Sequence, residues 1–253
     1  MRGRLVVPAR KPAAGPAPAA KKSDTRSLLL RPECTVSMTL FKASSVALFL
    51  SICLFGSPAG HAQNDPVLPA DEPVGGLSQA EWSRAWWQWA GSFERSESPV
   101  ADTTGELCDR KQSGAVWFLA GTYGTRRTVR TCRVPRGTYL FFPLINYVVM
   151  PRTDRPTSCM AVMSSAASMT NDVAALVLDI DGVRVQNLVR HRQATPQCFD
   201  MGARAEPRIR VFPSAANGYY VMLRPLSPGR HTLNFGGALP SMLQAVTYTL
   251  HVE

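Results

Sequence analysis

The sequence lacks most of the short motifs that mark enzymes and metal sites. It contains no Cys-x-x-Cys pair, no His-Glu-x-x-His, no Gly-x-Ser-x-Gly, no Walker loop and no dinucleotide fingerprint. Zinc ribbons, zincins, nucleophile-elbow hydrolases and nucleotide enzymes are therefore without support. These absences predict neither a metal nor a cofactor. The absence of motifs does not exclude a catalytic triad whose members are far apart in the sequence, because such a triad leaves no local motif.

The sequence also lacks an apolar run long enough to cross a membrane, and residues 63–253 lack a strong net charge. The apolar run at residues 43–55 is shorter than the roughly 20 residues that cross a bilayer as a helix. The formal net charge is +10, but residues 1–62 hold 9 of the 28 Lys and Arg and 2 of the 18 Asp and Glu, which leaves +3 for residues 63–253. We predict no transmembrane span in the mature chain and no nucleic-acid partner.

The first feature that is present is the pattern of a secretory signal peptide over residues 38–62. A basic start precedes the apolar run 43–55, and Gly60 and Ala62 place small residues at positions −3 and −1 of a cleavage site before Gln63. The pattern predicts an exported protein, periplasmic or extracellular, that is cleaved after Ala62.

Two features of this region leave alternatives open. Cys53 lies in a sequence similar to a lipoprotein box, which would tether the protein, but Ile52 occupies the position where that motif takes a small residue. Cleavage is therefore the favoured interpretation. Residues 1–37 mix Pro, Ala, Lys and Arg, and we interpret them as a disordered segment or an over-extended start upstream of Met38.

Four cysteines follow the signal sequence, namely Cys108, Cys132, Cys159 and Cys198. An even number in an exported chain predicts two disulfides. Three pairings are conceivable, and we favour Cys108–Cys132 with Cys159–Cys198 because each pair flanks one local unit. Each bond would stabilise the fold by roughly 3–4 kcal/mol in the chain-entropy account.

A helix is expected after the Pro- and Gly-rich lead of residues 63–77, which we expect to be flexible. Ser78 and Glu81 fit a capping box, which predicts a helix running to about residue 92. Three tryptophans share one face of this helix: Trp82, Trp86 and Trp89. We interpret that face as buried core rather than as a stacking platform for sugars. Trp87 lies off this face and is the candidate ligand-binding residue.

After residue 114, short apolar runs alternate with Gly and Pro turns, a pattern typical of strands. Such runs occupy residues 115–120, 127–134, 138–149, 176–180, 183–185, 219–223, 230–235 and 246–252. Residues 160–172 predict one further short helix, and Asp181-Gly182 predicts a tight hairpin turn. We expect a single, mostly β domain over residues 78–253, a β-sandwich or jelly-roll-like fold with the Trp-rich helix at its N-terminus.

Several segments together resemble a family of bacterial exported proteins of unassigned function. The segments are Trp86-Trp-Gln-Trp89, Val116-Trp-Phe-Leu-Ala-Gly121, Gly218-Tyr-Tyr-Val-Met-Leu223 and Pro228-Gly-Arg-His-Thr-Leu-Asn-Phe-Gly-Gly237. The resemblance covers most of residues 78–253. It implies one exported domain and supplies no activity.

Three residues are candidates for catalysis. Asp102 and Glu106 lie in a polar loop where carboxylates could act as acid and base or bind calcium, although a solvated loop is the simpler interpretation. His231 is expected to point to the same face of its strand as Leu233 and Phe235, which favours a core or rim histidine over a catalytic one. None of the three is part of a recognised motif.

Arginine gives the second candidate for ligand binding, because five arginines fall within residues 126–136. Arg127, Arg130 and Arg133 could bind an anionic polymer or phosphate groups of the envelope. The alternative is a charged, solvated strand face that keeps a sheet edge from aggregating.

These observations favour an exported binding or structural module of the cell envelope, with a glycan or an anionic envelope polymer as candidate partner. The alternative is a hydrolase of envelope or extracellular glycans that uses carboxylates such as Asp102 and Glu106. The sequence leaves catalysis open and favours binding. It does not predict the oligomeric state.

Overall fold

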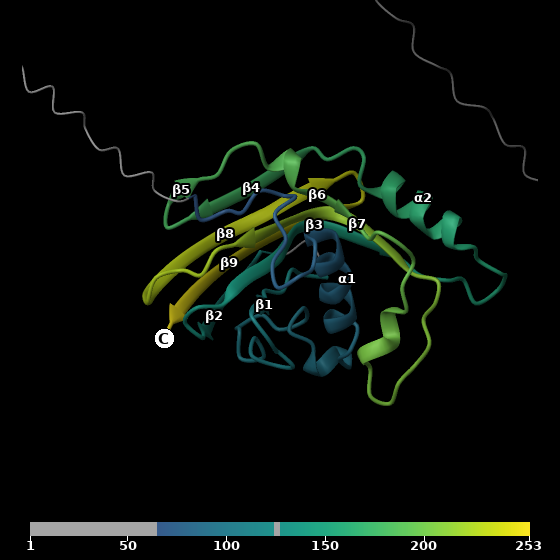
Figure 1. The fold of residues 1–253 in the computed structure, drawn as a ribbon, viewed down its shortest axis with the longest axis horizontal. Helices are drawn as coiled ribbons and strands as arrows, with labels where there is room; N and C mark the ends of the chain where they lie inside the picture. The colour runs from purple at the N-terminus through teal and green to yellow at the C-terminus, as the bar shows by residue number, and fades with distance from the viewer. Residues whose placement is uncertain (1–64, 124–126) are drawn as a thin grey trace, which may run out of the picture. The chain divides into compact units, whose positions relative to one another are not determined.

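Two β-sheets form the body of the protein in a computed structural model, which describes residues 65–123 and 127–253 (Figure 1). The four-stranded sheet has the order β1-β3-β7-β6 and the five-stranded sheet the order β2-β9-β8-β4-β5. The first contains β1 (Val116–Phe118), β3 (Tyr139–Val149), β6 (Arg192–Ala194) and β7 (Ala215–Leu223). The second contains β2 (Thr128–Val134), β4 (Ala175–Ile180), β5 (Val183–Arg184), β8 (Gly229–Leu239) and β9 (Met242–Val252). The β-rich prediction is confirmed.

The two sheets share one hydrophobic core and make a β-sandwich. Alternate residues of β3, among them Leu140 and Phe142, meet side chains of β8 and β9 such as Phe235 and Tyr248 in this core. The rings of Phe142 and Phe235 lie 4.5 Å apart between centroids. Both sheets are mixed, because β1 runs parallel to β3 and β2 runs parallel to β9.

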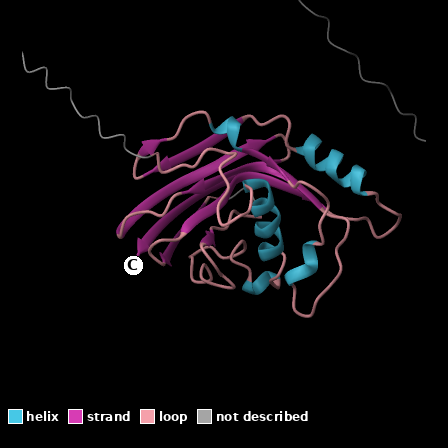
Figure 2. Cartoon of the chain, in the orientation of Figure 1, coloured by secondary structure: helices cyan, strands magenta, loops and turns pink. Residues whose placement is uncertain are grey.

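A helical layer covers the other face of the four-stranded sheet. Helix α1 (Gln79–Ala90) lies against the sheet in Figure 2. It packs against Phe141 of β3 and against Tyr220 and Met222 of β7. The capping box of Ser78 and Glu81 is present at its start. Every residue of β7 is buried because both faces of the strand are covered.

A β-bulge in β3 changes which side chains face which layer. The pairing of β3 with β7 shifts register between Pro143 and Ile145. Ile145 consequently joins Leu144 in the core between the sheets, and Asn146 turns toward the α1 side, where it meets Tyr220. Proline inside a strand marks a bulge because it cannot donate to the ladder.

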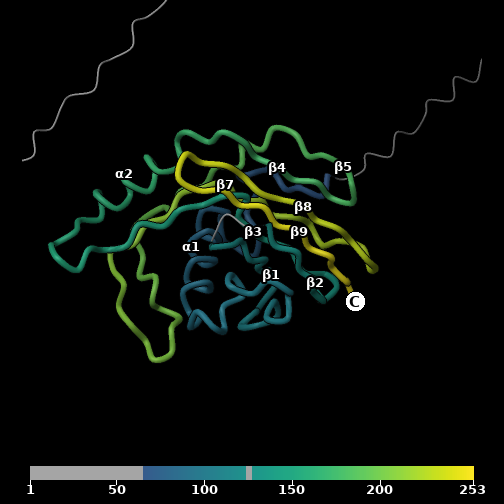
Figure 3. Tube along the Cα trace, turned by 180° about the vertical axis from the view of Figure 1, so that it is seen from behind, coloured from purple at the N-terminus to yellow at the C-terminus, as the bar shows by residue number. Residues whose placement is uncertain are grey.

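The smaller elements follow the sequence closely. Helix α2 (Cys159–Met169) is the second helix expected, and it lies at the end of the sandwich away from the C-terminus (Figures 1 and 3). Asp181 and Gly182 have φ of 50° and 83° in the turn between β4 and β5, as a tight hairpin requires. The described residues also contain three short 3₁₀ helices: η1 (Arg95–Glu97), η2 (Leu188–His191) and η3 (Met201–Arg204).

The lead segment is packed over residues 65–77, which corrects the expectation of a flexible lead at 63–77. Val67 forms a bridge with Leu223, and the Leu68 amide donates to the Met222 carbonyl over 2.9 Å. Both apolar side chains are buried. The segment is held in place because it extends the hydrogen bonding of β7 and adds to its core.

Both expected disulfides are present. Cys108 pairs with Cys132 and Cys159 pairs with Cys198, with Cα–Cα distances of 6.1 and 5.7 Å. The first lies in the core between the sheets, and the second ties α2 to the chain before η3. Among the described residues, no helix is long and apolar enough to cross a membrane. The expectations for residues 1–37, the signal peptide at 38–62 and Cys53 lie outside the described residues.

Candidate ligand-binding site

A cavity of about 280 Å³ lies beside the C-terminal half of α1, at the place where β3 ends and β8 turns into β9. Its apolar walls include the Trp87 ring and three methionines from separate parts of the chain: Met150, Met201 and Met242. Met150 is 47% exposed, so at least one wall reaches solvent. The cavity therefore combines an apolar interior with access from outside.

Trp87 is fixed in this wall by a hydrogen bond. Its indole Nε1 donates to the Tyr220 hydroxyl over 2.9 Å, and its ring meets Trp86 edge-on with centroids 5.1 Å apart. Tyr220 is fully buried, and burial raises the pKa of its hydroxyl, so it stays protonated. Trp87 lies off the buried face as the sequence indicates, while Trp86 and Trp89 are buried. With its N–H engaged, Trp87 offers the cavity an apolar ring.

Two buried polar side chains, Asn146 and Gln244, also line the cavity, and they differ in how many of their hydrogen-bonding groups already have partners. Gln244 is fully used: Nε2 donates to the carbonyls of Pro143 and Leu144 over 2.8 and 2.9 Å, and Oε1 accepts from the Thr122 amide. Asn146 donates through Nδ2 to the Tyr220 hydroxyl over 3.1 Å. Its Oδ1 has no partner within residues 65–123 and 127–253 and is not sealed from solvent.

One wall of the cavity comes from η3, which is pinned to α1. Gln88 donates through Nε2 to the Asp200 carbonyl over 3.0 Å. The Met201 side chain lies against Gly91, where a Cβ would approach its Cε to 3.0 Å. The cavity is thus assembled from four segments that are distant in the sequence, each held by its own contacts.

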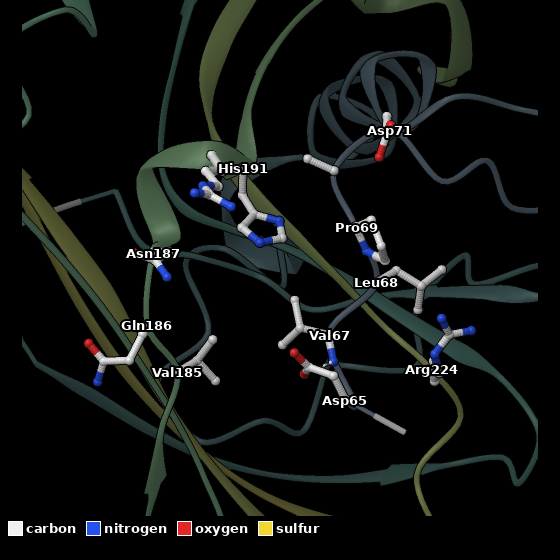
Figure 4. Close-up of a pocket in the computed structure, with 12 residues that line it drawn as sticks. Asp65, Val67, Leu68, Pro69, Asp71, Val185, Gln186, Asn187, His191 and Arg224 are labelled. Carbon is white, nitrogen blue, oxygen red and sulfur yellow. Dashed lines mark hydrogen bonds between the residues drawn. The ribbon is translucent and has the colours of Figure 1, made fainter. Parts of the chain in front are cut away.

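A second hollow, of about 700 Å³, is an open groove with a mixed polar and apolar lining between residues 65–71 and η2 (Figure 4). His191 and Arg224 line it, and Arg224 forms an ion pair with Glu72 at 3.1 Å. Burial lowers the pKa of His191, opposed by the charge of Asp65, and its Nδ1 has no hydrogen-bond partner in the described part of the chain. Charges of both signs line this groove, so it presents no single ligand chemistry.

The structure gives Asp102 a role in building its loop. Its carboxylate accepts from the amides of Thr104, Gly105 and Leu107 over 2.8, 2.9 and 3.0 Å. Partial burial works to raise its pKa, but these bonds outweigh burial and hold the pKa below its usual value. Glu106 is exposed in the same loop. Asp102 is therefore an ionised loop organiser.

His231 lies elsewhere, at the start of β8, and both of its ring nitrogens have partners. Nδ1 pairs with Asp181 over 2.7 Å, and Nε2 lies 2.8 Å from the Ser227 carbonyl. This rim position agrees with the simpler sequence interpretation. The structure therefore does not place His231 in one site with Asp102.

The expected cluster of exposed arginines is wrong for Arg130, which is buried. The side chain is 1% exposed and donates to the carbonyls of Val100, Asp102, Ala120 and Gly121 and to the Tyr248 hydroxyl. On β2, odd-numbered residues face solvent and even-numbered ones face the core. Arg130 thus points inward, so it cannot form an exposed ligand surface with its neighbours.

Arg133 on the outer face of β2 and Arg127, which directly precedes the strand, remain exposed. Arg133 forms an ion pair with Glu253 at 2.9 Å, and Arg127 donates to the Thr247 hydroxyl over 3.2 Å. Arg126 lies outside the described residues. Of the three arginines named as candidates, two stay exposed and one of these is paired with Glu253; Arg136 is exposed as well.

Metal ligands do not gather anywhere in the described ranges. No group of three or more His, Cys, Asp or Glu side chains among residues 65–123 and 127–253 is arranged to hold an ion. The cavity beside α1 has no carboxylate or histidine in its lining. Its lining offers mainly apolar contact, with the buried amides of Asn146 and Gln244 and the less buried hydroxyl side chains of Thr122, Tyr123 and Tyr147.

Comparisons with known proteins add little. No protein-family model matches the chain, and no curated protein matches it. A solved chain from the structure of PbICP-C in complex with falcipain-2 is 11% identical, covering 55% of this chain and 100% of that chain, with a TM-score of 0.25. This likeness is too low to carry an argument about fold or function.

Proposed function

We propose that this protein is an exported binding module of the cell envelope that holds its ligand in the cavity beside α1 and carries out no reaction on it. The observation that carries the proposal is the cavity itself, with the Trp87 ring fixed in its wall by Tyr220. A preformed apolar hollow with few polar groups is the usual form of a small-ligand site.

Export is supported by the cysteines and by the signal-peptide pattern at residues 38–62. Two disulfides are compatible with an oxidising compartment, where such bonds form and persist. The packing of residues 65–77 onto β7 also fits a mature chain that begins near the expected cleavage site after Ala62.

The structure supports the two ligand classes expected from the sequence, an anionic polymer and a glycan, to different degrees. The anionic polymer loses its main support, because Arg130 is buried and Arg133 is paired with Glu253. A glycan would have to present an apolar part to the Trp87 ring. The hydrolase alternative gains no specific observation, since the Asp102 carboxylate already accepts bonds from three amides.

The experiment that tests the proposal is a thermal-shift screen of the oxidised protein against glycans, anionic envelope polymers and envelope lipids. A ligand at about 100 times its Kd stabilises by roughly 2.7 kcal/mol, which raises Tm by about 5–10 °C in a domain of this size. We expect a hit with the wild type and with Trp82→Leu, and a weakened one with Trp87→Leu. The two variants are matched, because each removes one ring and one indole hydrogen bond from α1.

Two results would overturn the proposal. One is a flat screen on folded, oxidised protein. The other is a hit that is converted to product by the wild type but not by Asp102→Asn, which would establish the hydrolase.

A further inference from the structure

The cavity beside α1 also restricts which part of a ligand can enter it, an inference that rests on the proposed function. A cavity of about 150 Å³ lined by apolar side chains is known to hold a benzene ring. At about 280 Å³, this cavity has room for one ring or a short alkyl chain. It is too small for a polymer, so it takes one group of a larger molecule or a small molecule alone.

The walls suit an apolar group. Trp87 presents its ring with the N–H already bonded to Tyr220. Met150, Met201 and Met242 carry unbranched, polarisable side chains that adapt to the shape of a guest. A sugar ring would bury several hydroxyls here, and each one left without a partner would cost binding energy.

One polar contact is available in the buried part of the lining. Asn146 is 7% exposed and lines the cavity, and the bulge in β3 directs it to this side of the sheet. Its Nδ2 is taken by Tyr220, whereas Oδ1 has no partner in the described segments and is still reached by solvent. Gln244, the other buried polar residue, already makes hydrogen bonds through both its amide nitrogen and its amide oxygen.

We infer that the cavity binds an apolar alcohol, aliphatic or aromatic, whose hydroxyl donates a hydrogen bond to Asn146 Oδ1 while its carbon body lies against Trp87 and the three methionines. The hydroxyl gives Asn146 Oδ1 a hydrogen-bond donor, and the apolar rest of the guest needs no partner. The ligand is thereby defined as a hydroxyl-bearing alkyl or aryl group.

The test measures binding of n-hexanol and 4-propylphenol to the oxidised protein by calorimetry and by tryptophan fluorescence. The methyl ethers of both probes keep the apolar body and lose the donor, and glucose serves as a polyol. We expect each alcohol to bind about 3- to 10-fold more tightly than its ether, the range of one neutral hydrogen bond. We expect no binding of glucose in the cavity. Binding of one alcohol class alone identifies the guest as aliphatic or aromatic.

Two variants locate the contact. Asn146→Leu should remove the difference between alcohol and ether, and Asn234→Leu, at a half-buried asparagine on the outer face of β8, should keep it. Val148→Phe places a ring in the cavity wall and should abolish binding, while Val129→Phe at an exposed position of β2 should not. The comparison of alcohol with ether in the wild type needs no variant to fold.

Equal affinity for alcohol and ether, binding of neither alcohol, or unchanged binding in Val148→Phe would overturn the inference. These outcomes are separable from failure of the proposed function. If the alcohols bind as expected but no envelope component does, the inference stands and the module proposal fails. If an envelope component binds to the wild type and more weakly to Val148→Phe while the alcohols do not bind, the inference fails and the proposed function stands.

Discussion

The two faces of the four-stranded sheet are covered by different kinds of side chain: aliphatic and aromatic groups of the second sheet on one, and the indole rings of α1 on the other. Toward the second sheet, residues such as Phe142 and Val221 fill a core shared with five strands. Toward α1, the four tryptophans of the helix each donate through the indole N–H, to the carbonyls of Val74, Leu119 and Arg110 and to the Tyr220 hydroxyl. The first face is held by close packing, and the second by directional bonds from large rings.

This difference explains why the cavity lies on the α1 side. Interdigitated phenyl and aliphatic groups fill the space between two sheets, where each strand supplies a side chain at every second residue. Indole rings tied to loop carbonyls are fixed in position and cannot collapse to fill the space at the end of the helix. We therefore expect substitutions between the sheets to change stability, and substitutions around the cavity to change binding.

The largest effect is expected from Phe142→Ala, which removes a fully buried ring from the core between the sheets. The loss of contacts and the cavity left behind should lower the free energy of unfolding by about 3–5 kcal/mol. Chemical denaturation of the oxidised protein measures it. Ligand affinity of the remaining folded protein should be unchanged.

Phe141→Ala is the matched variant on the α1 face, where the ring stacks on Tyr220 with centroids 5.5 Å apart. It should destabilise by a similar amount and also weaken binding, because Tyr220 positions Trp87. If Phe141→Ala and Phe142→Ala reduce ligand affinity equally, the claim that only the α1 face of the sheet supports the binding cavity is wrong.

Arg130→Ala should give the next largest effect, about 2–4 kcal/mol, because it leaves buried carbonyls without donors. Its guanidinium joins β2 to the loops that contain Ala120 and Val100, so it connects the five-stranded sheet to the layer around α1. Arg127→Ala, at the exposed residue directly before the same strand, should change the free energy of unfolding by less than about 0.5 kcal/mol. Equal losses in urea denaturation would refute the assignment of a buried Arg130 and an exposed Arg127.

A small effect with a defined pH dependence is expected from His231 and Asp181, at the end of β8 away from the cavity. Partial burial opposes charging of both, but their mutual hydrogen bond and bonds from Thr232 and to Ser227 prevail: the pKa of Asp181 is lowered and that of His231 is raised. Asp181 therefore stabilises above its unfolded pKa of about 4, and His231 stabilises below its unfolded pKa of about 6.5.

The Tm difference between wild type and His231→Gln should consequently be greatest between about pH 4 and pH 6.5. It should decrease as His231 loses its proton at higher pH and as Asp181 gains one at lower pH. We expect less than about 1 kcal/mol, since Asp181 is largely solvated. A constant difference from pH 4 to pH 9 would contradict the ion pair, and ligand affinity should not follow this profile.

The sequence predicts what local patterns determine. The capping box of Ser78 and Glu81, the turn at Asp181-Gly182 and the alternation of the last strand all have the expected structure. The prediction that Arg130 is exposed is wrong, although the sequence contains the pattern that corrects it. Arg130 is two residues from Cys132 and so points to the same, buried face of the strand, whereas Arg133 points to the other face. Counting charges within a window ignores the two-residue period of a strand.

The cavity lies beyond what such patterns determine. It needs Trp87, Asn146, Met201 and Met242 from four segments, and their meeting depends on the packing of α1, on the β8–β9 hairpin and on the bulge in β3. Pro143 in the middle of an apolar run was the one available sign of that bulge. Trp87 could be singled out because helical spacing alone separates it from the buried tryptophans.

The most direct test of the ligand site uses NMR of the oxidised protein labelled with ¹³C at the methionine methyl groups, titrated with n-hexanol. Met150, Met201 and Met242 line the cavity, whereas Met160, Met163, Met169 and Met222 do not. We expect saturable shifts of the first three methyl signals and none for the other four. Shifts confined to methionines of α2, or no shift at any methionine, would contradict it.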